Sequence, residues 1–214
     1  MAFTINHGSV EHRKLASFAS STATMTTLAA IPAAQRFLGL EKFVEADKST
    51  WYFHDTSSLT AVTGLVAAPA SGNGRWLRKP GRVQIKMPIT FATADAAALI
   101  TMPTGAVLLP LFAYWEITTG WSGGSSSAIG LSSNVTWTTK GDILGGAAGD
   151  VAATLTTALS PQPGTVGAVL AATNRVLLKA TNTVRFDRIT SVFTAGAGNA
   201  VLVGDLLENA GALG

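Results

Sequence analysis

The stretch AVLLPLFAYWEITTGWSGGSSSAIGLSSN, residues 106–134, decides the fold class of this chain. Every second residue from Val107 to Trp121 is apolar, with the exception of Thr119. This alternation predicts one long strand whose apolar face covers a core. The glycine- and serine-rich residues 123–127 predict a turn, after which a second strand begins at Ala128.

Further strands are predicted on both sides of this stretch. In residues 82–91 the side chains expected to face inward are Val83, Ile85, Met87, Ile89 and Phe91, and Pro88 favours an edge strand or a bulge. We also expect strands at residues 98–102, 134–139, 140–146, 166–171, 175–180, 183–188 and 200–207, with residues 149–163 as a surface excursion. In residues 183–188, Val184 and Phe186 are expected to face inward and Arg185 and Asp187 outward.

These strands predict the fold class and the domain organisation. About eight short strands without a long helix predict an all-β chain with an antiparallel β-sandwich of jelly-roll type. The composition shifts near Pro80 and Gly81, so we expect the β-sandwich at residues 81–214, a small anchoring module at residues 25–80 and an N-terminal arm at residues 1–24. Within the module, residues 40–44 and 50–53 predict a β-hairpin, and residues 32–38 a short helical turn.

The composition indicates a surface that other molecules cover. Only 13% of the residues are charged and 47% are hydrophobic, whereas globular domains carry about 25% charged residues. So few charges predict burial against further copies of the chain or against another protein. The net charge of +3 is too small to favour nucleic-acid binding, and the chain has no cysteine. No apolar run reaches the roughly 20 residues of a membrane-spanning helix, so we expect no membrane insertion.

Two patterns suggest chemistry, and neither is convincing. Residues 120–124 match the G-x-S-x-G pattern of a serine hydrolase, which requires a helix after Ser122 and a histidine further along the chain. A strand is predicted after Ser122 instead, and all three histidines precede it. His7 and His12 are five residues apart, a spacing that does not place two metal ligands on one helix face. We therefore expect no catalytic residue, no metal site and no cofactor.

Two groups of residues are candidates for contacts with other proteins. The first combines basic side chains with a tryptophan near the domain boundary: Arg75, Trp76, Arg78, Lys79, Arg82 and Lys86. These residues predict contact with an acidic protein surface or with a nucleic-acid backbone or, alternatively, a solvated junction between module and sandwich. The second group is a candidate subunit interface on the long strand: Leu108, Phe112, Tyr114 and Trp121. The aromatic residues Tyr114, Trp121 and Trp137 also allow a carbohydrate-binding hypothesis, although core filling or a subunit interface is favoured.

The module at residues 25–80 resembles a small module in virion proteins of tailed bacteriophages. The resemblance lies in the placement of aromatic residues and glycines at residues 51–53, 55–58, 68–69 and 71–78. It implies a non-enzymatic capsid decoration or cement protein on the virion surface that binds the major capsid protein and forms a homo-oligomer, with a trimer expected. A head-fibre or tail receptor-binding protein is the alternative. A glycan-binding module or esterase is the alternative from a different class.

Overall fold

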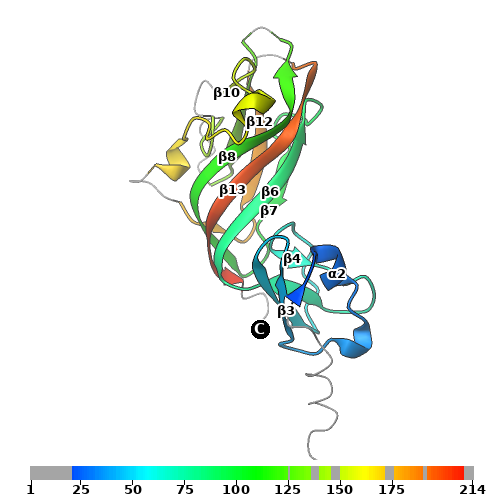
Figure 1. Ribbon diagram of the computed structural model, residues 1–214. Coiled ribbons are helices and arrows are strands. Elements are labelled where there is room, and N and C mark those ends of the chain that lie inside the picture. The colour runs from blue at the N-terminus through cyan, green and yellow to red at the C-terminus, as the bar shows by residue number, and fades with distance from the viewer. Residues whose placement is uncertain are drawn as a thin grey trace, which may run out of the picture.

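The computed structural model describes residues 21–124, 126–135, 140–145, 150–171, 176–189 and 192–209. In these residues the chain is an all-β protein with several antiparallel sheets, none of them closed (Figure 1). The expected fold class is confirmed at this level. A five-stranded module sheet has the order β1 (Ser21–Thr22), β2 (Glu41–Val44), β3 (Ser49–His54), β5 (Arg75–Arg78) and β4 (Val66–Ala67). Its β1–β2 pair is parallel.

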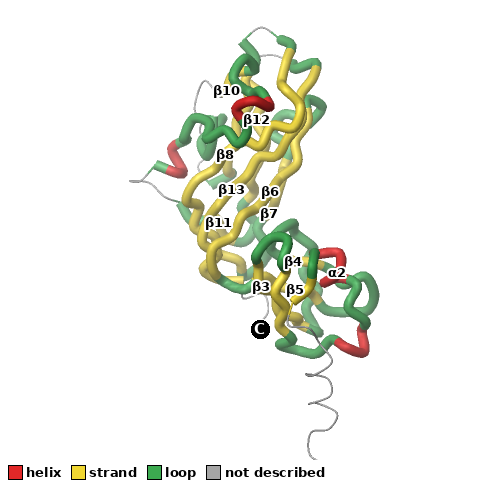
Figure 2. The backbone as a smooth tube through the Cα atoms, in the orientation of Figure 1, coloured by secondary structure: helices red, strands yellow, loops and turns green. Residues whose placement is uncertain are grey.

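Two four-stranded sheets make up the rest of the described chain. The long sheet has the order β11 (Leu178–Lys179), β8 (Ala106–Ser122), β13 (Ala195–Asn209) and β6 (Gly81–Thr90). The short sheet has the order β10 (Asp150–Val151), β9 (Ala128–Ser133), β12 (Thr183–Ile189) and β7 (Ala98–Thr101). Figure 2 shows β8, β13 and β6 running side by side along the part of the molecule outside the module.

One apolar core joins the two four-stranded sheets. Ile85, Trp115 and Leu202 of the long sheet belong to the same buried cluster as Ile129 and Phe186 of the short sheet. Each of these residues is fully buried. Burial of apolar surface between two sheet faces is the arrangement of a β-sandwich, and the described residues are consistent with one.

The module has a smaller core of its own and also contributes to the large one. Its own cluster is centred on Trp51, Phe53 and Trp76 and is closed on one side by the short helix α2 (Met25–Ala29). The module residues Leu65 and Leu77 instead belong to the core of the sandwich. The apolar core therefore continues across the boundary expected near Pro80 and Gly81.

The central strand β8 departs from the predicted alternation in its first half. Trp115, Ile117 and Trp121 are buried as expected, but before them Ala106 and Leu108 are buried while Val107 and Leu109 are partly exposed. The register shifts between Val203 and Gly204 of β13, which pair with Phe112 and Pro110, so Leu111 is an extra residue. This β-bulge exchanges the two faces of the strand, because an inserted residue reverses the alternation on one side of it.

The neighbouring edge strand β6 follows its prediction closely. Val83, Ile85, Met87 and Ile89 are buried in alternation with exposed residues. β6 pairs only with β13, which confirms the edge position that Pro88 favours. Phe91 was expected to face inward and is 41% exposed, because it follows the last residue of the strand.

Several other predictions are confirmed in outline. The hairpin at residues 40–44 and 50–53 is the antiparallel pair β2–β3. β7, β11, β12 and β13 lie where strands were expected, although β11 is shorter and β13 longer than predicted. The helical turn at residues 32–38 shrinks to the 3₁₀ turn η1 (Ala33–Gln35), and the helix α2 was not predicted.

Three predictions about the second half of the chain are wrong. Residues 134–135 and 140–143 are turns rather than the predicted strand pair. Leu144 forms two isolated bridges, with Leu131 and Val166, and residues 136–139 and 146 lie outside the described residues. Within the predicted strand 166–171, residues Ala168–Leu170 form the 3₁₀ turn η3. Asp187 was expected to face outward and is fully buried, because Ser132 and Gly141 donate hydrogen bonds to its carboxylate.

Candidate association surface

The outer face of the long sheet carries a row of partly exposed apolar residues on β8. We call this row the apolar band: Val107, Leu109, Leu111, Phe112 and Tyr114. Phe112 is 49% exposed. Its ring stacks on that of Tyr114, with the ring centroids 6.3 Å apart and the planes 20° from parallel.

The band exists because of the bulge in β8. Pro110 and Ala113 both face the core, so two consecutive residues between them, Leu111 and Phe112, are left on the outside. N-terminal to the bulge, the outward positions are Val107 and Leu109. The bulge thereby places aliphatic and aromatic side chains together on one face, where a regular strand would have separated them.

Polar residues on β6, β13 and β8 flank the band, and they include two ion pairs. Arg82 Nε lies 2.6 Å from Asp205 Oδ1, and Lys86 Nζ lies 2.7 Å from Glu116 Oε1. The side chains of Arg82 and Lys86 are 60% and 51% exposed, so each pair contributes at most about 1 kcal/mol to stability. Gln84 donates a hydrogen bond to the Tyr114 hydroxyl. The flank is thus polar, and each of these two ion pairs is neutral as a unit.

The predicted basic cluster is not one exposed patch. Trp76 is fully buried in the module core, and Arg78 is 4% exposed. Arg78 forms an ion pair with Asp47 at 3.8 Å. Burial lowers the pKa of Arg78, and the charge of Asp47 partly opposes this shift.

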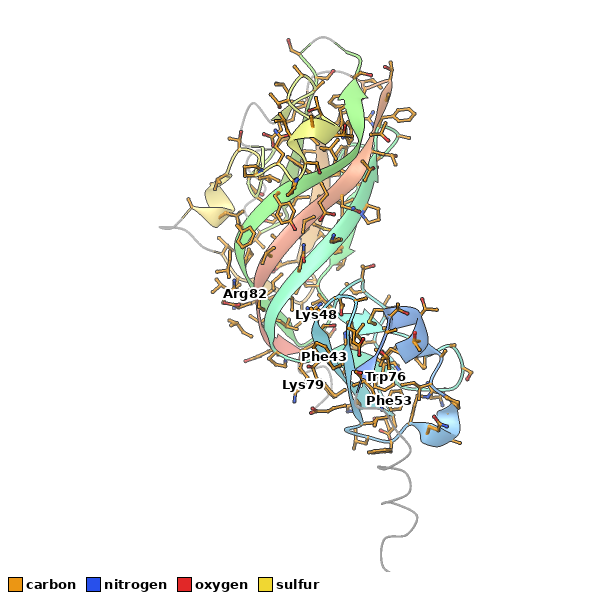
Figure 3. The ribbon with its side chains drawn as sticks, in the orientation of Figure 1. Phe43, Lys48, Phe53, Trp76, Lys79 and Arg82 are labelled. Carbon is orange, nitrogen blue, oxygen red and sulfur yellow. The ribbon has the colours of Figure 1, made fainter. Side chains whose placement is uncertain are left out.

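The other members of that cluster have partners as well. Arg75 donates hydrogen bonds from Nε to the carbonyl oxygen of Leu59 at 2.6 Å and from Nη1 to that of Gly74 at 2.7 Å. Lys79 Nζ lies 2.7 Å from Glu41 Oε1. Arg82 and Lys86 belong to the flank of the apolar band. Figure 3 shows Lys79 and Arg82 apart from the buried ring of Trp76. These contacts stabilise the module and its junction with the sandwich.

The predicted subunit interface is divided in two by the fold. Phe112 and Tyr114 lie in the apolar band. Leu108 and Trp121 lie in the core, 0% and 4% exposed, which removes them from any contact surface. Trp121 packs edge-on against Phe193, with the ring centroids 4.9 Å apart. Trp137, the third residue of the carbohydrate hypothesis, lies outside the described residues.

The serine motif lacks the structural context of a nucleophile elbow. Ser122 is the last residue of β8, and the next element in the described chain is the strand β9 rather than a helix. His54 lies on β3 in the module, and His7 and His12 are outside the described residues. Over the described ranges, no three histidine, aspartate or glutamate side chains cluster closely enough to hold a metal ion. No helix in the described part of the chain is long and apolar enough to cross a membrane.

Buried carboxylates are the functional groups that the sequence analysis missed. Asp150 accepts a hydrogen bond from Trp115 Nε1 at 2.6 Å, and Asp142 accepts one from the backbone N–H of Ser133 at 2.7 Å. Asp187 accepts hydrogen bonds from the Ser132 hydroxyl and the Gly141 N–H, at 2.9 and 2.8 Å. Burial raises the pKa of Asp187, and these hydrogen bonds offset the shift only in part. Through these hydrogen bonds the three carboxylates hold loop segments against the strands of the sheets.

Comparisons with known proteins do not assign this chain to a protein family. No protein-family model matches it, and no curated protein or solved structure is significantly similar to it.

Proposed function

We propose that the two four-stranded sheets form a jelly roll. The strand pairing supports this: β6 pairs with β13, β7 with β12, β8 with β11 and β9 with β10, all antiparallel. This is the pairing of one long hairpin whose outermost strands are β6 and β13. Successive pairs then alternate between the long and the short sheet, as they do when an eight-stranded hairpin rolls up into two Greek keys.

The protein is a structural component that associates with copies of itself through the long sheet. The observation that carries this proposal is the apolar band beside a polar flank of paired charges. Protein interfaces combine an apolar, aromatic-rich centre that lacks unpaired charge with a polar rim. The exposed ring of Phe112 at the centre and the Arg82–Asp205 and Lys86–Glu116 pairs beside it have this arrangement.

The module at residues 25–80 anchors the protein on its partner. Three of its large apolar side chains are exposed: Phe37 by 37%, Leu38 by 60% and Phe43 by 37%. They offer a second apolar contact, separate in sequence from the apolar band. An anchor on one partner combined with self-association on another face converts weak contacts into avidity on a repeating lattice.

The sequence resemblance of the module to tailed-phage virion proteins makes that lattice a capsid. In this role the chain decorates the outside of the virion, binds the major capsid protein through the module and forms a trimer through the sandwich. A head fibre or tail protein would use the same fold at far fewer positions.

The number of copies per virion tests this role. Quantitative mass spectrometry of density-purified virions, calibrated against the major capsid protein, gives the count directly. Hundreds of copies are expected for a decoration protein. About a dozen copies would instead indicate a fibre or tail component, and absence from purified virions would contradict the virion role itself.

A further inference from the structure

An open groove lies where the module meets the sandwich. Residues 58–62 of the module form one wall, and the turn between β7 and β8 together with Thr181 forms the other. The groove has a volume of about 480 Å³, within the range of small-molecule sites. Figure 1 shows the module at one end of the sandwich, and the residues that line the groove come from both.

Hydroxyl groups dominate the polar lining of this junction groove. Five side chains contribute them: Ser58, Thr60, Thr101, Thr104 and Thr181. Within the described residues none of these five hydroxyls takes part in a hydrogen bond, so each is available to a ligand as donor and acceptor. All five residues are exposed.

The rest of the lining is apolar and uncharged. Leu59, Val62, Met102 and Pro103 complete the described part of the lining, and none of its residues is charged. A charged ligand would therefore find no opposite charge in the groove. A purely apolar ligand would leave the hydroxyls without partners and would desolvate them.

Thr181 is held in an unusual conformation at the edge of the groove. Its φ of 71° lies in the left-handed region, which a β-branched residue rarely adopts. Its backbone N–H donates to the carbonyl oxygen of Met102 at 3.1 Å. This hydrogen bond connects the turn after β11 to the turn after β7. The conformation belongs to the turn between β11 and β12, in which the Asn182 N–H donates to the Lys179 carbonyl oxygen at 2.9 Å.

We propose that the junction groove binds a neutral saccharide. A sugar presents hydroxyl groups and apolar C–H faces together, and this matches five exposed hydroxyls without a hydrogen-bond partner in the described residues beside the partly exposed side chains of Leu59 and Val62. The groove is open and has no aromatic ring, so affinity for one or two sugar units is on the order of millimolar. The site is independent of the proposed virion role and lies apart from the aromatic residues considered for carbohydrate binding from the sequence.

The test is a nuclear magnetic resonance titration of the ¹⁵N-labelled full chain. Glucose, galactose, mannose, N-acetylglucosamine and the disaccharides maltose, lactose and chitobiose serve as probes, with sodium phosphate as an anionic probe. At least one sugar is expected to shift amide signals at residues 58–62, 101–104 and 181 in a saturable manner, whereas phosphate leaves them unchanged. No saturable shift with any sugar, shifts confined to other residues, or a stronger response to phosphate would overturn the proposal.

Isosteric variants test the role of the hydroxyls. The double variant Thr60→Val and Thr101→Val removes two hydroxyls without changing side-chain volume and is expected to weaken sugar binding about tenfold. Ser58→Ala provides a second, milder variant that preserves the loop. Thr118→Val, on the exposed face of β8 and outside the groove, is the matched control and is expected to bind like the wild type. Unchanged affinity in the double variant would contradict the proposal.

Discussion

At the scale of single residues, the most unusual side chain is Asp187, because an ionisable group is fully buried. Its carboxylate is fully buried, and burial raises its pKa above the ordinary value of about 3.9. The folded chain therefore binds this proton more tightly than the unfolded chain does. The stabilising contribution of Asp187 is complete below about pH 4 and is lost as the pH rises through the raised folded pKa.

The variant Asp187→Asn makes this contribution measurable. We expect the difference in unfolding free energy, wild type minus variant, to fall as the pH increases from about 3 to 8, because only the wild type acquires a buried charge. Urea denaturation at a series of pH values gives this difference. A difference that is flat or that rises with pH would contradict the account.

Asp95 provides a control of opposite sign. Burial alone would raise its pKa, but hydrogen bonds from the Lys140 ammonium and the Arg188 N–H lower it overall. Its contribution is therefore present above the unfolded pKa and is lost as the pH falls. The same difference measured for Asp95→Asn is expected to rise with pH.

At the scale of elements, the bulge in β8 determines which residues face the core. Leu108 is fully buried and Leu109 is partly exposed, the reverse of what an unbroken alternation through Trp115 predicts. Leu108→Ala is expected to lower the unfolding free energy by about 2–5 kcal/mol, as large-to-small core substitutions do. Leu109→Ala is expected to lower it by less than about 1 kcal/mol. Chemical denaturation of the two variants compares them directly, and the opposite order would show that β8 has no bulge.

Alternation predicts a strand well where the pairing is regular. β6 pairs continuously with β13 from Gly81 to Thr90, and its burial pattern follows the sequence residue by residue. The bulge at Leu111 depends on the register between β8 and β13, which are far apart in the chain. No local pattern in β8 encodes that register, so the prediction was correct for Trp115 and wrong for Leu108.

The burial of Asp187 could not be predicted either, because it also depends on residues far away in the sequence. Asp187 lies in an alternating segment, and the inward positions of Val184 and Phe186 predict an outward position for it. Its hydrogen-bond donors, Gly141 and Ser132, are 46 and 55 residues away in the sequence. Their hydrogen bonds offset the free-energy cost of burying the carboxylate. The register between β8 and β13 also explains why Leu108 of the predicted interface lies in the core, whereas Trp121 is buried as the alternation itself predicts.

At the scale of the whole molecule, Asn209 adds polar contacts to the apolar junction between the module and the sandwich. Asn209, the last residue of β13, donates hydrogen bonds from Nδ2 to the carbonyl oxygens of Leu65 and Arg78, at 3.1 and 3.0 Å. The Tyr52 hydroxyl donates to the Asn209 carbonyl oxygen at 3.1 Å. Asn209 is 2% exposed, so its partners lie in a dry junction.

Asn209→Ala is expected to destabilise this junction by about 1–3 kcal/mol, because two buried carbonyl groups lose their donor. We expect faster trypsin cleavage at the junction, after Arg78 or Arg82, and separate thermal transitions for module and sandwich, measured by limited trypsin digestion and calorimetry. Tyr52→Phe removes a single hydrogen bond and is expected to have a smaller effect in the same direction. A single unchanged transition in Asn209→Ala would contradict the proposed linkage.

The central claim is that the outer face of the long sheet associates with copies of the same chain. Sedimentation equilibrium of the full chain across micromolar concentrations tests it most directly, with Phe112→Ser as the variant and Phe91→Ser, which removes a similarly exposed ring elsewhere, as the control. We expect the wild type and the control to form oligomers, with a trimer as the predicted species, and Phe112→Ser to sediment as a monomer. A wild type that is monomeric at every concentration, or a Phe112→Ser variant that associates as the wild type does, would contradict the account.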